Sequence, residues 1–130
     1  MEVKINKAAS LCNHEVLHLL NVLKEEPQEQ NAPTNSHLAT IFYETSHFLQ
    51  DSGYAEQNGT MITNALLALK QFPVALTKEE KLMIVNYPPT TNLQLSLIVR
   101  DVDDRLTEEQ MQELLNLIQI YLLSENNRNK

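Results

Sequence analysis

The sequence predicts an all-α fold of about six helices. Of the 130 residues, 42% are apolar but only 5% are aromatic. Leucine far outnumbers valine, isoleucine and the aromatic residues, and glycine occurs only twice. Strong helix formers therefore dominate, and the residues typical of strands are scarce, so helix is favoured over sheet. This length fits one domain with a single core.

The N-terminal segment predicts a short strand followed by the first helix. Val3 and Ile5 alternate with polar residues as in a strand, yet no other stretch of the chain looks able to pair with it. The segment is therefore expected either to fray or to join a sheet edge on another protein. Asn13 is a suitable cap for a helix that reaches about residue 24. Its inward stripe is expected to be Val16, Leu19, Leu20 and Leu23.

A connector and two more helices follow. Residues 25–37 hold two prolines and almost no apolar side chain, so we expect a flexible, solvated linker. An apolar stripe from Leu38 to Leu49 predicts a second helix that ends before Gly53. A further stripe from Ile62 to Leu69 predicts a third helix, which Pro73 ends.

Three T-x-x-E/Q patterns mark the starts of the remaining helices, since the threonine and the third residue after it can cap each other's backbone amides. They are Thr77 with Glu80, Thr91 with Gln94, and Thr107 with Gln110. The first of these helices should end near Asn86, because Pro88 disfavours helical geometry just before it. Residues 93–97 also alternate like a strand, but leucine and the cap favour helix. The last helix carries one apolar face, formed by Met111, Leu114, Leu115, Ile118 and Leu122.

The stretch NHEVLHLL, residues 13–20, contains the spacing H-E-x-x-H, in which zinc peptidases place two metal ligands and a general base. Its members are His14, Glu15 and His18. With helical periodicity both histidines fall opposite the apolar stripe. The longer form of the motif fails, because Asn21 and Lys24 occupy the offsets of the required glycine and third histidine.

Three other residues have side chains that could serve as a third zinc ligand. His37, Glu44 and His47 lie beyond the linker, and no motif aims them at the first helix. A zinc metallopeptidase is therefore kept only as an alternative, and we assign no catalytic residue, no metal and no other cofactor. Cys12 is expected to be a small apolar residue beside the first helix.

Charge and length limit the partners. The net charge is -7 and the ten basic residues are scattered, so no stripe exists that could neutralise a run of phosphates. Nucleic acid is expected to be contacted at most indirectly. A single cysteine, no signal-like start and no long apolar run predict a soluble protein of a reducing compartment without a membrane partner.

The segment 101–113, DVDDRLTEEQMQE, holds six carboxylates and one arginine. Such side chains suit a solvated loop and a helix start. The alternative is a docking surface for a basic protein partner. That candidate surface consists of Asp101, Asp103, Asp104, Glu108 and Glu109.

Four stretches carry a resemblance to a known family. They are MEVK, NHEVLHLLNVLKE, LTKEEKLMIVNYPPTTNLQLSLIV and RLTEEQMQELLNLI. Together they resemble the small stalk subunit of RNA polymerase III, the calcitonin gene-related peptide receptor component protein family. The similarity covers most of residues 1–23 and 76–118, in order and with comparable spacing. The LTKxEKLxxxNxxP element followed by RLTEEQ is rather specific to that family.

The resemblance implies a helical domain like the helicase and RNase D C-terminal (HRDC) domain over residues 38–124. It also implies an N-terminal strand and helix, residues 1–24, that dock the larger stalk subunit, with residues 25–37 as the linker. Residues 125–130 are expected to be a disordered tail. The implied interface consists of Val3, Ile5, Leu17, Leu20, Leu23, Leu114 and Ile118. The three leucines of the first helix are expected to pack against the partner or against the last helix.

The function implied by the resemblance is that of a non-catalytic, nuclear subunit. The stalk heterodimer protrudes from the polymerase core and recruits the initiation factor that contains the TATA-binding protein. In that role it supports transcription of tRNA, 5S rRNA and other small RNA genes. A stand-alone nucleic-acid-binding HRDC module stays open as a second alternative.

Overall fold

The structure, a computed structural model, describes residues 9–25, 36–52 and 57–123. Within these ranges the chain is all helical and contains no strand, so the predicted fold class is confirmed. Three predicted segments lie wholly or mostly outside the described residues: the strand at Val3 and Ile5, the linker at 25–37 and the tail at 125–130. The elements are α1 (Asn13–Glu25), α2 (Ser36–Asp51), α3 (Gly59–Gln71), α4 (Lys78–Asn86), α5 (Asn92–Ile98), α6 (Val102–Arg105), α7 (Glu108–Ile118) and a π-helical turn, η2 (Gln119–Leu123).

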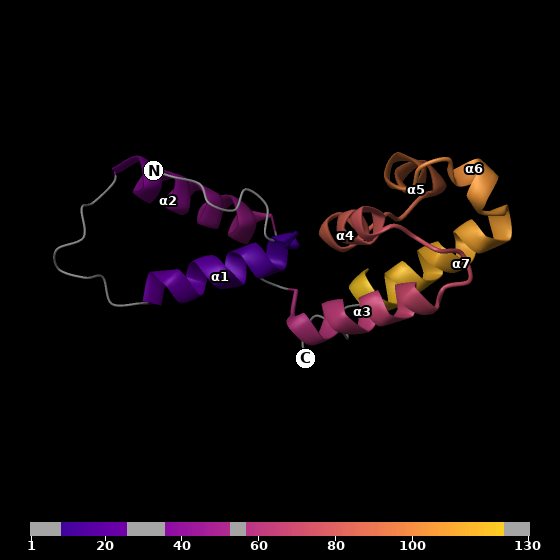
Figure 1. The fold of residues 1–130 in the computed structure, drawn as a ribbon, viewed down its shortest axis with the longest axis horizontal. Coiled ribbons are helices and arrows are strands. Elements are labelled where there is room, and N and C mark those ends of the chain that lie inside the picture. Colours follow the sequence, from indigo (N-terminus) through magenta and orange to yellow (C-terminus); the bar gives the residue numbers. More distant parts are fainter. Residues whose placement is uncertain (1–8, 26–35, 53–56, 124–130) are drawn as a thin grey trace.

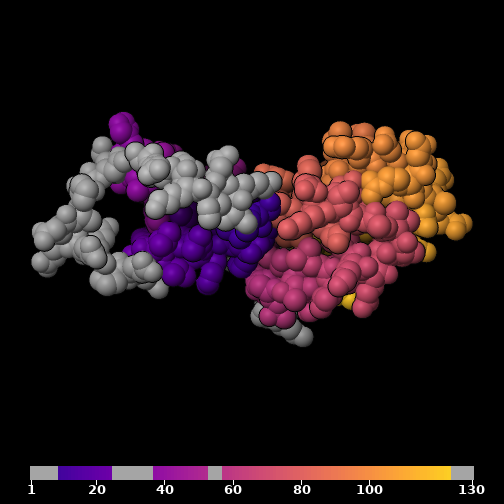
Figure 2. Space-filling view, viewed as in Figure 1, coloured from indigo at the N-terminus to yellow at the C-terminus, as the bar shows by residue number. Residues whose placement is uncertain are grey.

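The helices form two groups (Figure 1). Helices α1 and α2 lie side by side at one end of the molecule, and α3 to η2 pack together at the other. The space-filling view shows the two groups as adjoining lobes (Figure 2). The main contacts of α2 are thus with α1. The division between residues 1–24 and 38–124 stays a prediction.

The small cluster between α1 and α2 has Leu17 and Leu49 at its centre. Leu17 is only 2% exposed, and Val16 and Leu20 pack half-buried around this pair. Leu19 and Leu23 are each 47% exposed, so their expected inward position is wrong. Periodicity grouped them with Val16 and Leu20, but α2 packs on the side of α1 around Leu17, which lies next to that stripe and not on it.

The main core lies among α3 to η2. Helix α3 packs against α4, α7 and η2, while α5 packs against α4 and α7. The apolar face predicted for the last helix is buried as expected, with Leu114 and Ile118 fully inaccessible. The core cluster consists of Met61, Ala65, Leu69, Phe72, Leu76, Ile84, Leu95, Val99, Val102, Leu106, Met111, Leu114, Leu115, Ile118 and Leu122.

The ambiguous segment 93–97 is helical. Leu95 is fully buried, whereas Leu93 and Leu97 are 73% and 75% exposed. The strand-like alternation therefore reflects two surface leucines that flank one core leucine. None of the described helices combines the length and apolarity that a membrane crossing requires.

Two of the three predicted capping boxes are complete. Thr77 with Glu80 and Thr107 with Gln110 each exchange both hydrogen bonds. At the start of α5, Thr91 accepts from the amide of Gln94 as expected. The side chain of Gln94, however, accepts from the amide and hydroxyl of Thr90 instead, so the reciprocal half of that predicted box is wrong.

Candidate partner-binding surfaces

The start of α1 shows what the H-E-x-x-H glutamate does. The amide of Val16 donates to the Cys12 carbonyl over 3.0 Å, which places Cys12 at the N-cap position. Glu15 Oε1 accepts from the Cys12 amide over 3.0 Å. This hydrogen bond is the main cause that lowers the pKa of Glu15. Glu15 therefore satisfies a helix-end donor, as the third residue of a capping box does.

The cap predicted at Asn13 is one residue too late. The backbone amide of Asn13 instead donates to Asn86 Oδ1 over 2.8 Å and so joins the start of α1 to the end of α4. Beside this contact the Cys12 side chain is buried with Ile62 and Val85. Desolvation by this burial raises the pKa of the Cys12 thiol. The predicted role of Cys12 as a small buried residue next to the first helix is confirmed.

The candidate zinc ligands are spread over two helices. His14 is half-buried and His18 is exposed on α1, while the side chains considered as third ligands are exposed on α2. Those third ligands are His37, Glu44 and His47. Within the described ranges no three His, Cys, Asp or Glu side chains form a group that could hold a metal ion.

Helices α1 and α2 each carry an exposed apolar face. On α1, Leu19, Val22 and Leu23 follow a spacing of three and four residues and are 42 to 47% exposed. On α2, Leu38, Ile41 and Phe48 also follow helical spacing and are 60 to 62% exposed. We call these six residues the α1–α2 surface. Large apolar side chains gathered on a surface typically mark sites of protein–protein contact.

The interface residues expected from the sequence occupy different environments. Leu23 belongs to the α1–α2 surface, and Leu20 is half-buried beside it. Leu17 is buried against α2. Leu114 and Ile118 are fully buried in the main core, where this conformation offers none of their surface to another chain.

The five residues of the candidate acidic surface are all exposed. Asp101 precedes α6 in a left-handed conformation with φ of 51°, and Asp103 and Asp104 lie in the α6 turn. Glu108 and Glu109 occupy the first turn of α7. Val102 and Leu106 are buried beneath this region, so its surface is carboxylate without apolar neighbours from the same segment. Its role as a docking surface stays a prediction.

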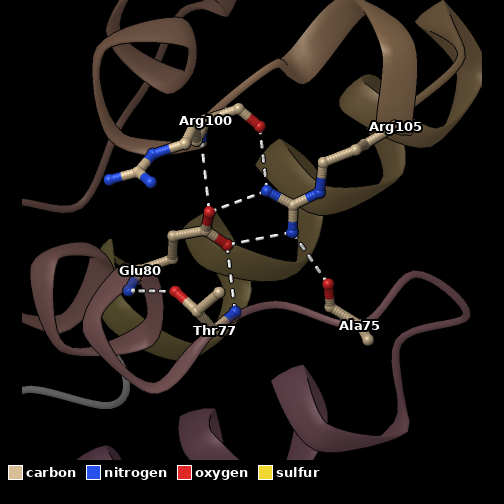
Figure 3. A network of polar contacts seen from close by, with 5 residues as sticks. All are labelled: Ala75, Thr77, Glu80, Arg100 and Arg105. Carbon is tan, nitrogen blue, oxygen red and sulfur yellow. Dashed lines mark hydrogen bonds and ion pairs between the residues drawn. The ribbon is translucent and has the colours of Figure 1, made fainter.

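The most extensive polar network centres on Glu80 and Arg105 (Figure 3). Glu80 is only 6% exposed and lies at the third position of α4. Its Oε1 accepts from Arg105 Nη1 over 2.7 Å and from the Arg100 amide over 3.3 Å. Its Oε2 accepts from Arg105 Nη2 over 3.1 Å and from the Thr77 amide over 3.0 Å.

The same network satisfies two backbone carbonyls. Arg105 Nη1 donates to the Arg100 carbonyl and Nη2 to the Ala75 carbonyl, each over 2.8 Å. The hydrogen bonds from Arg105 are the largest cause that lowers the pKa of Glu80 to about 2. The network therefore joins the start of α4 to the segment between α5 and α7.

The T-x-x-E pattern predicts Glu80 only as a capping residue and gives no sign of its pairing with Arg105. Arg105 is the single basic residue in the acidic segment 101–113, which was the available signal. Nothing local indicated that its partner lies 25 residues earlier. The network stabilises the packing of the helices against one another. The features suited to binding another protein are the exposed apolar faces.

The described part of the chain is all helical, and the exposed apolar faces of α1 and α2 suit it to binding another protein. A family model described as RNA polymerase Rpb4 matches residues 10–122. The chain belongs to the RNA polymerase Rpb4 family. It is accordingly a small stalk subunit of RNA polymerase, an accessory subunit that is not itself catalytic, and its partners are the polymerase complex and a second stalk subunit.

Proposed function

We propose that this chain serves RNA polymerase III. The observation that carries the proposal is the segment 76–118, where LTKEEKLMIVNYPP and RLTEEQ occur in order and resemble the RNA polymerase III branch of stalk subunits. In the structure this segment forms α4 to α7, including both complete capping boxes and the Glu80–Arg105 pair. The same residues that carry the resemblance thus hold the main core together.

The larger stalk subunit is proposed to dock on the N-terminal part of the chain. The α1–α2 surface supports this, because its six apolar side chains face outward while the helix pair has only a small cluster of its own at Leu17 and Leu49. A partner that covers these side chains would gain about 25 cal/mol for each Å² of apolar area removed from water. Val3 and Ile5 are proposed to add a strand to the same partner.

Residues 38–124, which contain most of α2 and all of α3 to η2, are proposed to be the HRDC-like domain that projects from the stalk. In this role the stalk heterodimer recruits the initiation factor containing the TATA-binding protein and supports transcription of tRNA and 5S rRNA genes in the nucleus. The acidic surface at residues 101–109 suits a basic face on such a factor. Nucleic acid would be contacted only through other subunits.

The proposal is tested by purifying the tagged full chain from nuclear extract under mild conditions. Subunits unique to RNA polymerase III should copurify in fixed proportion, and depletion of the chain should lower new tRNA and 5S rRNA transcripts before messenger RNA. Recovery of RNA polymerase II subunits instead would keep the family and overturn the polymerase assignment.

A pair of variants tests the docking surface within that experiment. Leu23→Asp combined with Ile41→Asp puts charge on both exposed helix faces and should abolish copurification of the larger stalk subunit. Leu97→Asp is the matched control, because Leu97 is 75% exposed on α5 in the other lobe. If Leu97→Asp reduced copurification of the larger stalk subunit as much as the double variant does, the α1–α2 surface would not be the docking site.

A further inference from the structure

A groove of about 420 Å³ lies between the segment that precedes α1 and helices α3 and α4. Its floor is apolar, formed by the buried side chains of Cys12, Ile62 and Val85. Leu66 and Leu67 of α3 also line it and are 38% and 53% exposed. The groove therefore offers apolar contact area that this chain leaves open to solvent.

Three lysines border the same groove. Lys70 comes from the end of α3, and Lys78 and Lys81 come from α4. Among the described residues of the lining the only carboxylate is Glu15, which already accepts a hydrogen bond from the Cys12 amide. None of the three lysines forms an ion pair with a described residue. In a chain of net charge -7, the groove is a locally positive, apolar channel.

Helix α4 separates its charges between two faces. Lys78, Lys81 and Val85 follow a helical spacing of three and four residues along the groove. Glu79 and Glu80 line a different hollow, on the side of Arg105. Helix α3 contributes Lys70 as its only charged residue. Neighbouring helices thus direct positive charge toward one channel, which favours a negatively charged occupant.

We propose that this groove binds an acidic amphipathic segment of a protein partner. The apolar side chains of that segment contact Leu66 and Leu67, and its carboxylates lie beside the three lysines. This binding site goes beyond the stalk assignment and does not depend on which polymerase the chain serves. It is also separate from the α1–α2 surface, since none of the six residues of that surface lines the groove. An amphipathic helix laid into a groove is a common mode of peptide recognition.

Other occupants fit less well. Four segments of the chain lie outside the described residues. Of these, 1–8 and 124–130 carry a net positive charge, 26–35 has almost no apolar residues, and 53–56 is only four residues long. A second copy could offer the acidic segment 101–113, but its Val102 and Leu106 are buried in that copy's own core. Nucleic acid would match the lysines but not the apolar floor.

The test is a titration of the full chain with a synthetic helical peptide that carries leucines at a spacing of three and four residues, separated by glutamates. Binding is followed by fluorescence anisotropy, and the contact residues by amide chemical shifts. The matched probes are the same peptide with every glutamate replaced by lysine, and with every leucine replaced by serine. A single-stranded RNA oligonucleotide and the chain itself at raised concentration are the remaining arms.

The proposal predicts saturable binding of the acidic leucine peptide, with shifts confined to α3, α4 and residues 10–15. Lys70→Glu combined with Lys81→Glu should weaken it about tenfold, because two attractions become repulsions. Leu67→Ser, at an exposed position, should weaken it without disturbing the fold. Lys24→Glu, an exposed lysine at the end of α1, should leave it unchanged.

Five results would overturn the proposal. Equal binding of the acidic and lysine peptides, or no binding of either, would remove the charge argument. Preferential binding of RNA would make the groove a phosphate site. Self-association of the chain that displaces the peptide would show that the groove is a dimer contact. Loss of peptide binding when the larger stalk subunit is bound, with groove amides protected, would assign the groove to the stalk interface.

Discussion

The Glu80–Arg105 pair should account for a large part of the stability of the main core. The perturbation is Glu80→Gln, which keeps the shape of the side chain but removes its charge and one acceptor oxygen. In the structure the Glu80 carboxylate accepts two hydrogen bonds from Arg105 and one each from the Thr77 and Arg100 amides. The substitution leaves these four N–H donors without a charged acceptor.

The magnitude follows from the pKa of Glu80. A fall from the ordinary value of 4.5 to about 2 corresponds to about 3 kcal/mol of stabilisation of the folded state at neutral pH. Because the glutamine carbonyl oxygen can still accept two of the four hydrogen bonds, we expect the variant to lose about 2 to 3 kcal/mol of unfolding free energy. Helical circular dichroism during urea unfolding measures this difference.

The pH dependence of the unfolding free energy tests the Glu80–Arg105 pair in a second, independent way. The folded-state pKa of Glu80 lies below the unfolded-state value, so its contribution is complete above a pH of about 4.5 and is lost as pH falls toward about 2. The difference between the natural protein and Glu80→Gln should shrink over that interval. Glu79→Gln, on the exposed neighbouring residue, should cost only about 0.5 kcal/mol. Equal costs for the two variants, or a difference that does not change with pH, would refute the reasoning.

Further predictions concern the core, the thiol and a cap. Leu114→Ala removes a fully buried side chain and should cost about 2 to 5 kcal/mol in urea unfolding, whereas Leu97→Ala should stay within about 0.5 kcal/mol. The Cys12 thiol should react with a disulfide reagent far more slowly in the folded protein than in urea, because it is buried and its pKa is raised; equal rates would show that the site is open. Thr77→Ala should cost about 1 kcal/mol, restored in part by Thr77→Ser; an unchanged stability would mean that the cap contributes nothing.

Local signals predicted the helices well. The capping pairs at Thr77 and Thr107 specify their helix starts through residues only three positions apart, so no distant contact is needed. The box at Thr91 failed in one half because a neighbouring residue, Thr90, offers Gln94 a competing pair of donors. Helix α6 was missed, since its four residues follow a left-handed Asp101 and carry no periodic pattern.

Features set by tertiary contacts could not be predicted in the same way. Which leucines of α1 are buried depends on where α2 lies, and periodicity alone placed Leu19 and Leu23 inward although both are exposed. The Glu80–Arg105 pair joins residues that are distant in sequence, and each also has a plausible local role. Similarly, the lysines of the groove lie on two helices and come together only in the fold.

The proposed pairing joins the N-terminal helices of this chain to the larger stalk subunit of RNA polymerase III. The most direct measurement is hydrogen exchange of the full chain, alone and after mixing with that subunit or with its RNA polymerase II counterpart. We expect a stable heterodimer with the RNA polymerase III subunit only, with slowed exchange across residues 1–25 and α2. Unchanged exchange there, or preferential pairing with the RNA polymerase II subunit, would contradict the account.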